Sequence, residues 1–167
     1  TQIVHEGGGL VDTDLIANEQ AVILITEQGY IKRMPVNTFG AQNRATKGKS
    51  GAKIKEDDVV EHFLTCCDHD YVLFFSDRGV VYSLNAYQVP VASRTARGVP
   101  IVQMLPIPKD EKITSIVAVT EFTADQYFIM LTRKGLIKKT ALSAFSNIRA
   151  NGLIAISLTE GDQLRWV

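Results

Sequence analysis

The hydrophobic positions of this chain recur in one phrase that is repeated three times. Each copy has four apolar residues, a Ser or Thr, two polar residues, a Gly and a second apolar start, and the copies occupy residues 22–33, 72–83 and 128–139. A hairpin loop often needs one residue in the left-handed backbone region, which Gly adopts without steric cost. The phrase therefore predicts a buried strand, a hairpin turn and a partner strand.

The repeat continues beyond the hairpin, because an Arg and a Gly follow each turn glycine at matching distances. The turn glycines Gly29, Gly79 and Gly135 are 50 and 56 residues apart. The matching pairs are Arg44 and Gly48, Arg94 and Gly98, and, slightly closer to the turn, Arg149 and Gly152. Units of this length are typical of propeller blades or solenoids. We expect an all-β fold of three blades, fewer than the four to eight of most closed propellers and hence an incomplete ring.

Outside the hairpins, short runs rich in β-branched and aromatic residues predict further strands. These strands are expected at 59–65, 99–105, 113–120, 153–158 and 163–167, and a single helical turn at 141–145. Residues 1–19 are expected to form an N-terminal linker segment. The β-domain is then 20–167, with blades at about 20–69, 70–124 and 125–167.

Length and composition are those of a water-soluble, globular protein. The chain has 167 residues, of which 46% are hydrophobic, so it can bury a real core. No apolar run approaches the roughly 20 residues of a membrane helix, and the first residues resemble neither a signal nor a transit peptide. The adjacent Cys66 and Cys67 fall on opposite faces of a predicted strand, which favours reduced thiols in a cytosolic protein.

Charge alternates along the chain in phase with the repeat. The formal net charge is zero, yet residues 28–55, 78–109 and 126–159 contain most of the Lys and Arg residues and no acid. Equivalent segments of a repeat lie along one rim when the units stack. The pattern predicts a positive rim suited to a polyanion, whereas ordinary solvation of exposed hairpins would not exclude acids from all three segments.

Enzymatic and metal sites are not supported by the residue patterns. Gly48-Lys49-Ser50 ends like a phosphate-binding loop, but the position that this loop needs as Gly is Asn43. His62 and Cys66 would face one side of a strand, and Cys67 and His69 the other, which argues against zinc. We expect no catalytic residue and no metal site, and hence a chain that is inactive alone.

Several stretches resemble the C-terminal domain of the DNA gyrase A subunit, and the resemblance covers essentially the whole chain. Besides the repeats, they are Gly29-Tyr30-Ile31-Lys32-Arg33-Met34-Pro35 and Ala92-Ser93-Arg94-Thr95-Ala96-Arg97-Gly98. The family signature Gln-Arg-Arg-Gly-Gly-Lys-Gly corresponds here to Gln42-Asn43-Arg44-Ala45-Thr46-Lys47-Gly48. Four of its seven positions match, Asn43 loses one charge, and Ala45-Thr46 stiffens a loop that carries two glycines in the family.

The resemblance implies a β-pinwheel, a propeller-like ring whose neighbouring blades exchange a strand, and a rim that binds, bends and wraps double-stranded DNA without reading its sequence. In this family wrapping supports ATP-dependent negative supercoiling by the type IIA topoisomerase, and the cleavage tyrosine belongs to a preceding domain. The resemblance also leaves the related domain of the topoisomerase IV A subunit open. A propeller that binds a protein partner is the alternative from another class.

Together the charge pattern and the resemblance predict a set of DNA-contacting residues. They are Lys32, Arg33, Gln42, Asn43, Arg44, Lys47, Gly48, Lys49, Lys53, Arg94, Arg97, Lys138, Lys139 and Arg149. Arg forks bind phosphate oxygens in pairs, and Gly lets backbone amides approach.

The expected partners besides DNA are the gyrase B subunit, together with the catalytic part of the gyrase A protein. ATP and Mg²⁺ are implied for the holoenzyme and no cofactor for this chain. The resemblance places the protein in the bacterial cytoplasm with the nucleoid, or in a plastid. An unpaired edge at the third blade also predicts that two copies of the chain can pair, with a monomer whose end is covered by residues 1–19 as the alternative.

Overall fold

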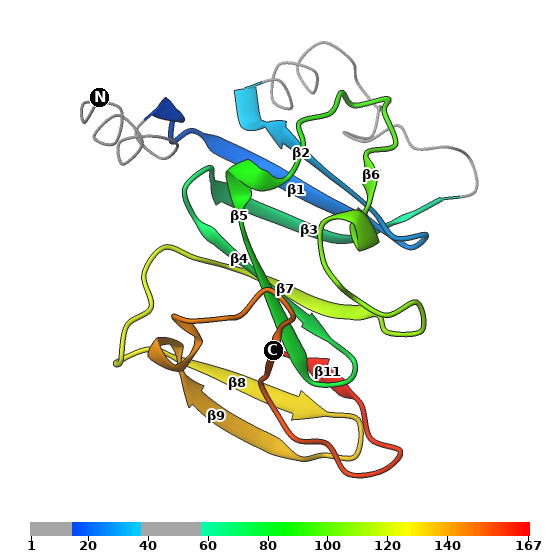
Figure 1. Cartoon of the computed structure of the whole chain (residues 1–167), viewed down its shortest axis with the longest axis vertical. Helices are drawn as coiled ribbons and strands as arrows, with labels where there is room; N and C mark the ends of the chain where they lie inside the picture. The colour runs from blue at the N-terminus through cyan, green and yellow to red at the C-terminus, as the bar shows by residue number, and fades with distance from the viewer. Residues whose placement is uncertain (1–14, 38–57) are drawn as a thin grey trace, which may run out of the picture.

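The three repeats fold into three antiparallel sheets. The computed structural model describes residues 15–37 and 58–167, and Figure 1 shows the sheets following one another along the long axis. Sheet A has the order β3 (Val60–Cys67), β1 (Gln20–Thr26), β2 (Tyr30–Pro35), β6 (Val99–Pro100). Sheet B has the order β10 (Leu153–Ile154), β5 (Val80–Asn85), β4 (Tyr71–Ser76), β7 (Ile113–Val119). Sheet C has the order β11 (Leu164–Trp166), β8 (Tyr127–Thr132), β9 (Ile137–Ala141).

Each predicted hairpin is confirmed, and its turn has the same hydrogen bonds in all three repeats. Gly29, Gly79 and Gly135 have φ of +89°, +80° and +91°. Each glycine amide donates to the carbonyl of the Ser or Thr three residues earlier, at 3.0 Å. The hydroxyl of that residue accepts the next amide, as Thr26 Oγ1 does from Tyr30 at 3.1 Å. The Ser or Thr is therefore in the phrase to complete the turn.

Neighbouring repeats exchange a strand, as the resemblance implied. After β5 the chain crosses to sheet A, where β6 pairs with β2 through Val99 opposite Ile31. After β9 it crosses to sheet B, where β10 pairs with β5 through Leu153 opposite Val81. In both cases the edge of a hairpin strand is completed by a segment of the following repeat. The chain then returns to pair with the first strand of its own hairpin, as β7 does with β4.

Gly98 and Gly152 mark the places where the exchanged segments reach the preceding sheet. Both have φ of +91°. A Cβ on Gly98 would lie 2.4 Å from the carbonyl oxygen of Ile31, and one on Gly152 would lie 2.8 Å from Cγ1 of Val80. A side chain is excluded twice at each position, by backbone conformation and by space.

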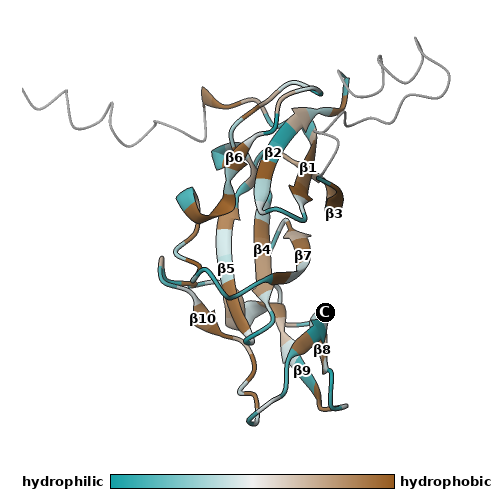
Figure 2. Ribbon diagram, turned by 90° about the vertical axis from the view of Figure 1, so that its right-hand side faces the viewer, coloured by the Kyte–Doolittle hydropathy of each residue, from teal (hydrophilic) through white to brown (hydrophobic). Residues whose placement is uncertain are grey.

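The middle sheet is buried on both faces and joins the other two sheets. Val72 and Phe74 of β4 pack in a cluster with residues of sheet A, whereas Leu73 and Phe75 pack in a cluster with residues of sheet C. The Phe75 ring lies 5.5 Å from that of Phe128, between ring centroids, in an edge-to-face arrangement. Burial on both faces explains the uninterrupted apolar run of β4. Figure 2 shows β4 mostly in the colours of hydrophobic residues.

A buried acid lies two residues before the third strand of each repeat. These acids are Asp58, Glu111 and Asp162. Asp58 and Asp162 support the hairpin turns, since Asp58 Oδ1 accepts the amide of Gln28 at 3.1 Å and Asp162 Oδ1 that of Lys134 at 3.0 Å. Burial opposes ionisation of Asp162, but hydrogen bonds from a threonine and from two amides outweigh it and lower its pKa. Part of the acidic charge that alternates along the chain is therefore internal to the fold.

Two predicted strands are much shorter than expected. Of 99–105 only Val99 and Pro100 are extended, and Ile101–Gln103 form the 3₁₀ helix η2. Of 153–158 only Leu153–Ile154 are extended. The strand pairing ends where a backbone amide donates to the carbonyl of a hairpin glycine. The amide of Ile101 donates to the carbonyl of Gly29, and the amide of Ala155 to that of Gly79, both at 2.8 Å.

The other predicted elements are confirmed with small shifts. β3, β7 and β11 correspond to the strands expected at 59–65, 113–120 and 163–167, and the helical turn expected at 141–145 is the 3₁₀ helix η3 (Leu142–Phe145). A further 3₁₀ helix, η1 (Ala86–Gln88), was not expected. Cys66 is buried, Cys67 is half-buried, and both are free thiols. Within the described ranges no helix is long and apolar enough to cross a membrane.

Replacing Gly98 by Ala should destabilise the chain more than replacing Gly135 by Ala. Both glycines have φ of +91°, but a Cβ on Gly135 meets no atom within 4 Å. Gly135→Ala should therefore cost about 1–2 kcal/mol of backbone strain. Gly98→Ala should cost a further 1–3 kcal/mol, roughly, because the carbonyl of Ile31 must move. Urea unfolding of the two variants measures the difference, and equal losses would show that the exchanged segment tolerates a side chain.

Candidate nucleic-acid interface

The predicted DNA-contacting residues fall into two groups. The family box at 42–48, together with Lys49 and Lys53, lies outside the described residues. The structure does describe the counterparts of the box, which are the segments 92–98 and 146–152 that lead into the exchanged strands. These segments contain Arg94, Arg97 and Arg149.

The first of these segments lies along the outer edge of β2. The amide of Arg33 donates to the carbonyl of Pro90 at 3.1 Å, and the amide of Ala92 donates to the carbonyl of Arg33 at 3.0 Å. Arg33 and Val91 form a parallel bridge. Together with the β2–β6 pairing, these bonds hold the approach to Gly98 against sheet A.

Lys32 is buried beneath this segment, so its predicted contact with phosphate is corrected. The residue is 2% exposed, and its ammonium donates to the carbonyls of Ser93, Arg94 and Ala96 at 3.1, 3.0 and 3.0 Å. A lysine has three donors, and all three are used. Burial lowers the pKa of Lys32. Its ammonium therefore serves the carbonyls of the following repeat and is closed to a ligand.

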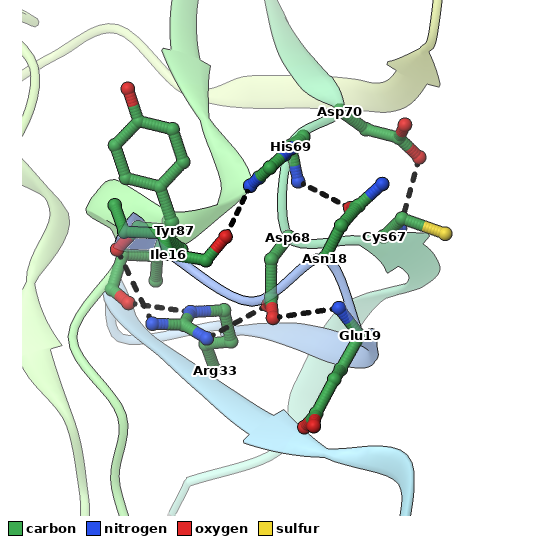
Figure 3. Close-up of polar contacts among 10 residues, drawn as sticks. Ile16, Asn18, Glu19, Arg33, Cys67, Asp68, His69, Asp70 and Tyr87 are labelled. Atoms are coloured by element: carbon green, nitrogen blue, oxygen red, sulfur yellow. Dashed lines mark hydrogen bonds and ion pairs between the residues drawn. The ribbon is translucent and has the colours of Figure 1, made fainter. Parts of the chain in front are cut away.

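Arg33 is likewise engaged within the protein, and its predicted phosphate contact is corrected for the same reason. Nη1 forms an ion pair with Asp68 Oδ1 at 2.9 Å, Nε donates to the carbonyl of Val89 at 2.9 Å, and Nη2 donates to that of Tyr87 at 3.2 Å. Figure 3 shows the guanidinium between these groups. The planar fork suits several acceptors at once. Lys32 and Arg33 both lie on a strand whose edge is covered by the following repeat. A count of charges along the sequence cannot detect that coverage.

Arg94 and Arg97 lie on the covering segment itself, and both are partly exposed. The Arg97 guanidinium carbon is 4.7 Å from the ring centroid of Tyr30, and Nη1 donates to the Tyr30 hydroxyl at 3.1 Å. The backbone carbonyl of Arg94 accepts a hydrogen bond from the Lys32 ammonium. No hydrogen-bond or ion-pair partner of the Arg94 guanidinium is found among the described residues.

In the third repeat the predicted residues are exposed. Lys138 and Lys139 are the repeat counterparts of Lys32 and Arg33, but β9 is an edge strand of sheet C. Lys138 donates to the carbonyl of Ala155 at 2.9 Å, and the Lys139 ammonium lies 4.1 Å from the ring centroid of Tyr127. Arg149 is exposed in a turn closed by a bond from the Gly152 amide to its carbonyl, at 2.9 Å.

A polar network that the sequence patterns did not predict ties residues 16–19 to the turn between β3 and β4. The amide of Glu19 donates to Asp68 Oδ2 at 3.2 Å, and the amide of His69 donates to Asn18 Oδ1 at 3.0 Å. The His69 ring is hydrogen-bonded to the carbonyl of Ile16 at 2.8 Å (Figure 3). The end of the expected linker is therefore fixed to sheet A. The sequence feature that could have indicated this network is the pair of acidic residues, Asp68 and Asp70, on either side of His69 in the turn.

The candidate zinc ligands do not converge. The His62 ring is hydrogen-bonded to the carbonyl of Ile113 at 2.9 Å, and the His69 ring to the carbonyl of Ile16 at 2.8 Å. The described residues contain no group of three or more His, Cys, Asp or Glu side chains placed to hold a metal ion.

Strand-exchanged antiparallel sheets joined by crossover segments define a propeller-like class of β-protein. The chain belongs to the DNA gyrase C-terminal domain family, described as a beta-propeller, whose model matches residues 20–67, 70–120 and 126–167. The resemblance drawn from the sequence and the β-pinwheel fold class are confirmed.

Known relatives are similar over nearly the whole chain. The chain is 82% identical to the DNA gyrase A protein of Synechocystis sp. over 167 residues, which are 100% of the chain and 19% of that protein. It is 51% identical to the chloroplastic/mitochondrial DNA gyrase A protein of Arabidopsis thaliana, over 97% of the chain and 17% of that protein. A solved C-terminal domain of DNA topoisomerase IV superposes with a TM-score of 0.72 at 26% identity, covering 90% of this chain and 45% of that one. The chain thus spans about a fifth of the length of these curated relatives.

Arg33 and its repeat counterpart Lys139 should differ sharply when each is replaced by Met. Arg33→Met leaves Asp68 and two carbonyls without their donor, and breaking such a partly buried pair should cost about 3 kcal/mol. Lys139→Met removes an exposed contact with an aromatic ring, which should cost less than about 1 kcal/mol. Denaturant unfolding measures both. A small loss for Arg33→Met would show that its contacts do not stabilise the fold.

Proposed function

We propose that this chain binds, bends and wraps double-stranded DNA, without regard to sequence, as a module of the gyrase A protein. In the holoenzyme, wrapping would support ATP-dependent negative supercoiling. The observation that supports the proposal is the pair of crossover segments, which contain Arg94 and Arg149 and lead into the exchanged strands of a chain in the gyrase family.

The chemistry of these segments favours contact with the phosphate backbone. Their functional groups are guanidinium and ammonium ions, with glycines that bring the main chain close, and such groups position a protein on DNA without reading its bases. The described residues offer no helix long enough to enter the major groove. Selectivity would come from how easily the DNA bends, as for histones.

The chemical steps are assigned to other parts of the enzyme. We expect no nucleophile with a neighbouring base in this chain, which would be inactive alone. The gyrase B subunit, together with the catalytic part of the gyrase A protein, would be its partner in a type IIA topoisomerase, and ATP and Mg²⁺ would act there. Bacterial and plant organellar relatives favour the nucleoid-associated cytoplasm or a plastid.

Membership of topoisomerase IV is the second candidate, because one solved structure of similar fold is a topoisomerase IV domain. The 82% identity to a gyrase protein favours gyrase. A topology assay on the complete enzyme separates the two functions, since gyrase introduces negative supercoils. Loss of supercoiling on deletion of this segment supports the first candidate.

DNA affinity should fall steeply with salt. If three basic segments contact about two phosphates each, the slope of log affinity against log salt should be about −5. Fluorescence anisotropy with duplexes of different sequence but equal flexibility measures the slope and should give similar affinities. Replacing Arg94 and Arg149 together by Ala should bring the slope to about −3. Lys112→Ala, an exposed lysine outside the basic segments, is the control. A slope near −1 would favour a protein-binding propeller.

We also propose that the isolated chain can pair through β9, whose outer edge carries no partner strand in the described sheet C. Ile137 is 65% exposed there, and unpaired edges recruit strands. Residues 16–19, being fixed to sheet A, do not cover this edge. Light scattering across a concentration series should show a mass that approaches twice 18.4 kDa. Ile137→Lys should prevent the rise, and a monomer at every concentration would refute the pairing.

A further inference from the structure

Lys32 is a buried charge whose donors are all satisfied within the protein, and the proposed DNA binding gives it no role. The three donors of Lys32 meet three carbonyls that all belong to the following repeat, at Ser93, Arg94 and Ala96. Lys32 is 2% exposed, so it cannot touch DNA itself. Its bonds are to the segment that presents the arginines.

These bonds fix the backbone on both sides of one arginine. The carbonyl of Ser93 belongs to the peptide plane before the Arg94 Cα, and the carbonyl of Arg94 belongs to the plane after it. Since peptide planes are rigid, holding both planes sets φ and ψ of Arg94 and hence the direction in which its side chain leaves the backbone. A third bond, to Ala96, holds the plane before Arg97.

The second repeat lacks this arrangement. The counterpart of Lys32 is Tyr82, whose hydroxyl donates to the buried Glu111 at 2.7 Å. The approach to Gly152 packs against the Tyr82 ring, since a Cβ on Gly152 would lie 2.9 Å from Cε1. Arg149 therefore has no ammonium beneath it and provides an internal comparison.

We propose that Lys32 is a positioning residue: from beneath the segment 93–97 it sets the direction in which Arg94 meets a DNA phosphate. The inference rests on the proposed DNA-binding function. Lys32 makes no contact with the nucleic acid, and its effect on affinity passes through Arg94.

A double-mutant cycle tests the inference on the full chain. Lys32→Met keeps the length of the stem and removes the ammonium, Arg94→Ala removes the phosphate contact, and the third variant combines them. Lys112→Met is the control for loss of one positive charge. Duplex DNA binding is measured across a salt series for each variant after circular dichroism has shown that it is folded. Lys32→Gln, which keeps an amide donor, replaces Lys32→Met if the latter does not fold.

Lys32→Met should raise the dissociation constant by the same factor as Arg94→Ala, and each should reduce the steepness of the log–log slope by about 0.9. The combined variant should lose no more than either alone, because the two residues act on one contact. Hydrogen exchange should quicken at the Ala96 amide, which donates to Ser93, and stay unchanged at the Ile101 amide, which donates to Gly29.

Two results would overturn the inference and one would overturn its basis. Additive losses in the combined variant would mean that Lys32 affects DNA affinity independently of Arg94. A folded Lys32 variant with unchanged affinity would mean that the ammonium serves stability alone. If Arg94→Ala itself leaves affinity unchanged, the proposed interface fails, and the positioning role fails with it.

Discussion

The structure depends on the completion of each hairpin strand by a segment of the following repeat. The outer edge of β2 is covered by residues 90–100, and that of β5 by the segment that contains β10. An uncovered strand edge leaves a row of backbone donors and acceptors for solvent or for another chain. Exchange satisfies these groups and makes each repeat incomplete without its neighbour. Repeats coupled in this way are stable mainly as an array.

The same exchange places the candidate DNA-binding groups. A basic side chain on a hairpin strand is buried if the next repeat covers its edge, and it is exposed if nothing covers it. Lys32 and Lys138 occupy equivalent positions, yet the first holds three carbonyls and the second is exposed on β9. The loops that carry Arg94 and Arg149 are held by the preceding sheet. Both loops thus belong to a scaffold that is buried on both faces at β4.

Much of this fold could be predicted from the sequence, because the determinants of a hairpin are local. The run of apolar residues, the Ser or Thr and the turn glycine are close together in the chain, and each has one physical task. The matching Gly98 and Gly152 were found from spacing alone. Their reason is non-local, since it lies in the backbone of Ile31 and in the side chain of Val80. The candidate site could be predicted only in part, because burial of a charge depends on contacts far apart in the sequence. Lys32 lies 61 residues before Ser93, and no count of charges shows that they meet.

Hydrogen exchange with and without duplex DNA locates the binding surface without altering a residue. If the crossover segments form the DNA-binding rim, DNA should slow exchange in 91–97 and 146–152 and leave the buried amides of β4 unchanged. Protection confined to the groove between β7 and β8, which is lined by Val117, Glu121 and Tyr127, would contradict this assignment. The binding surface would then lie on another face of the protein.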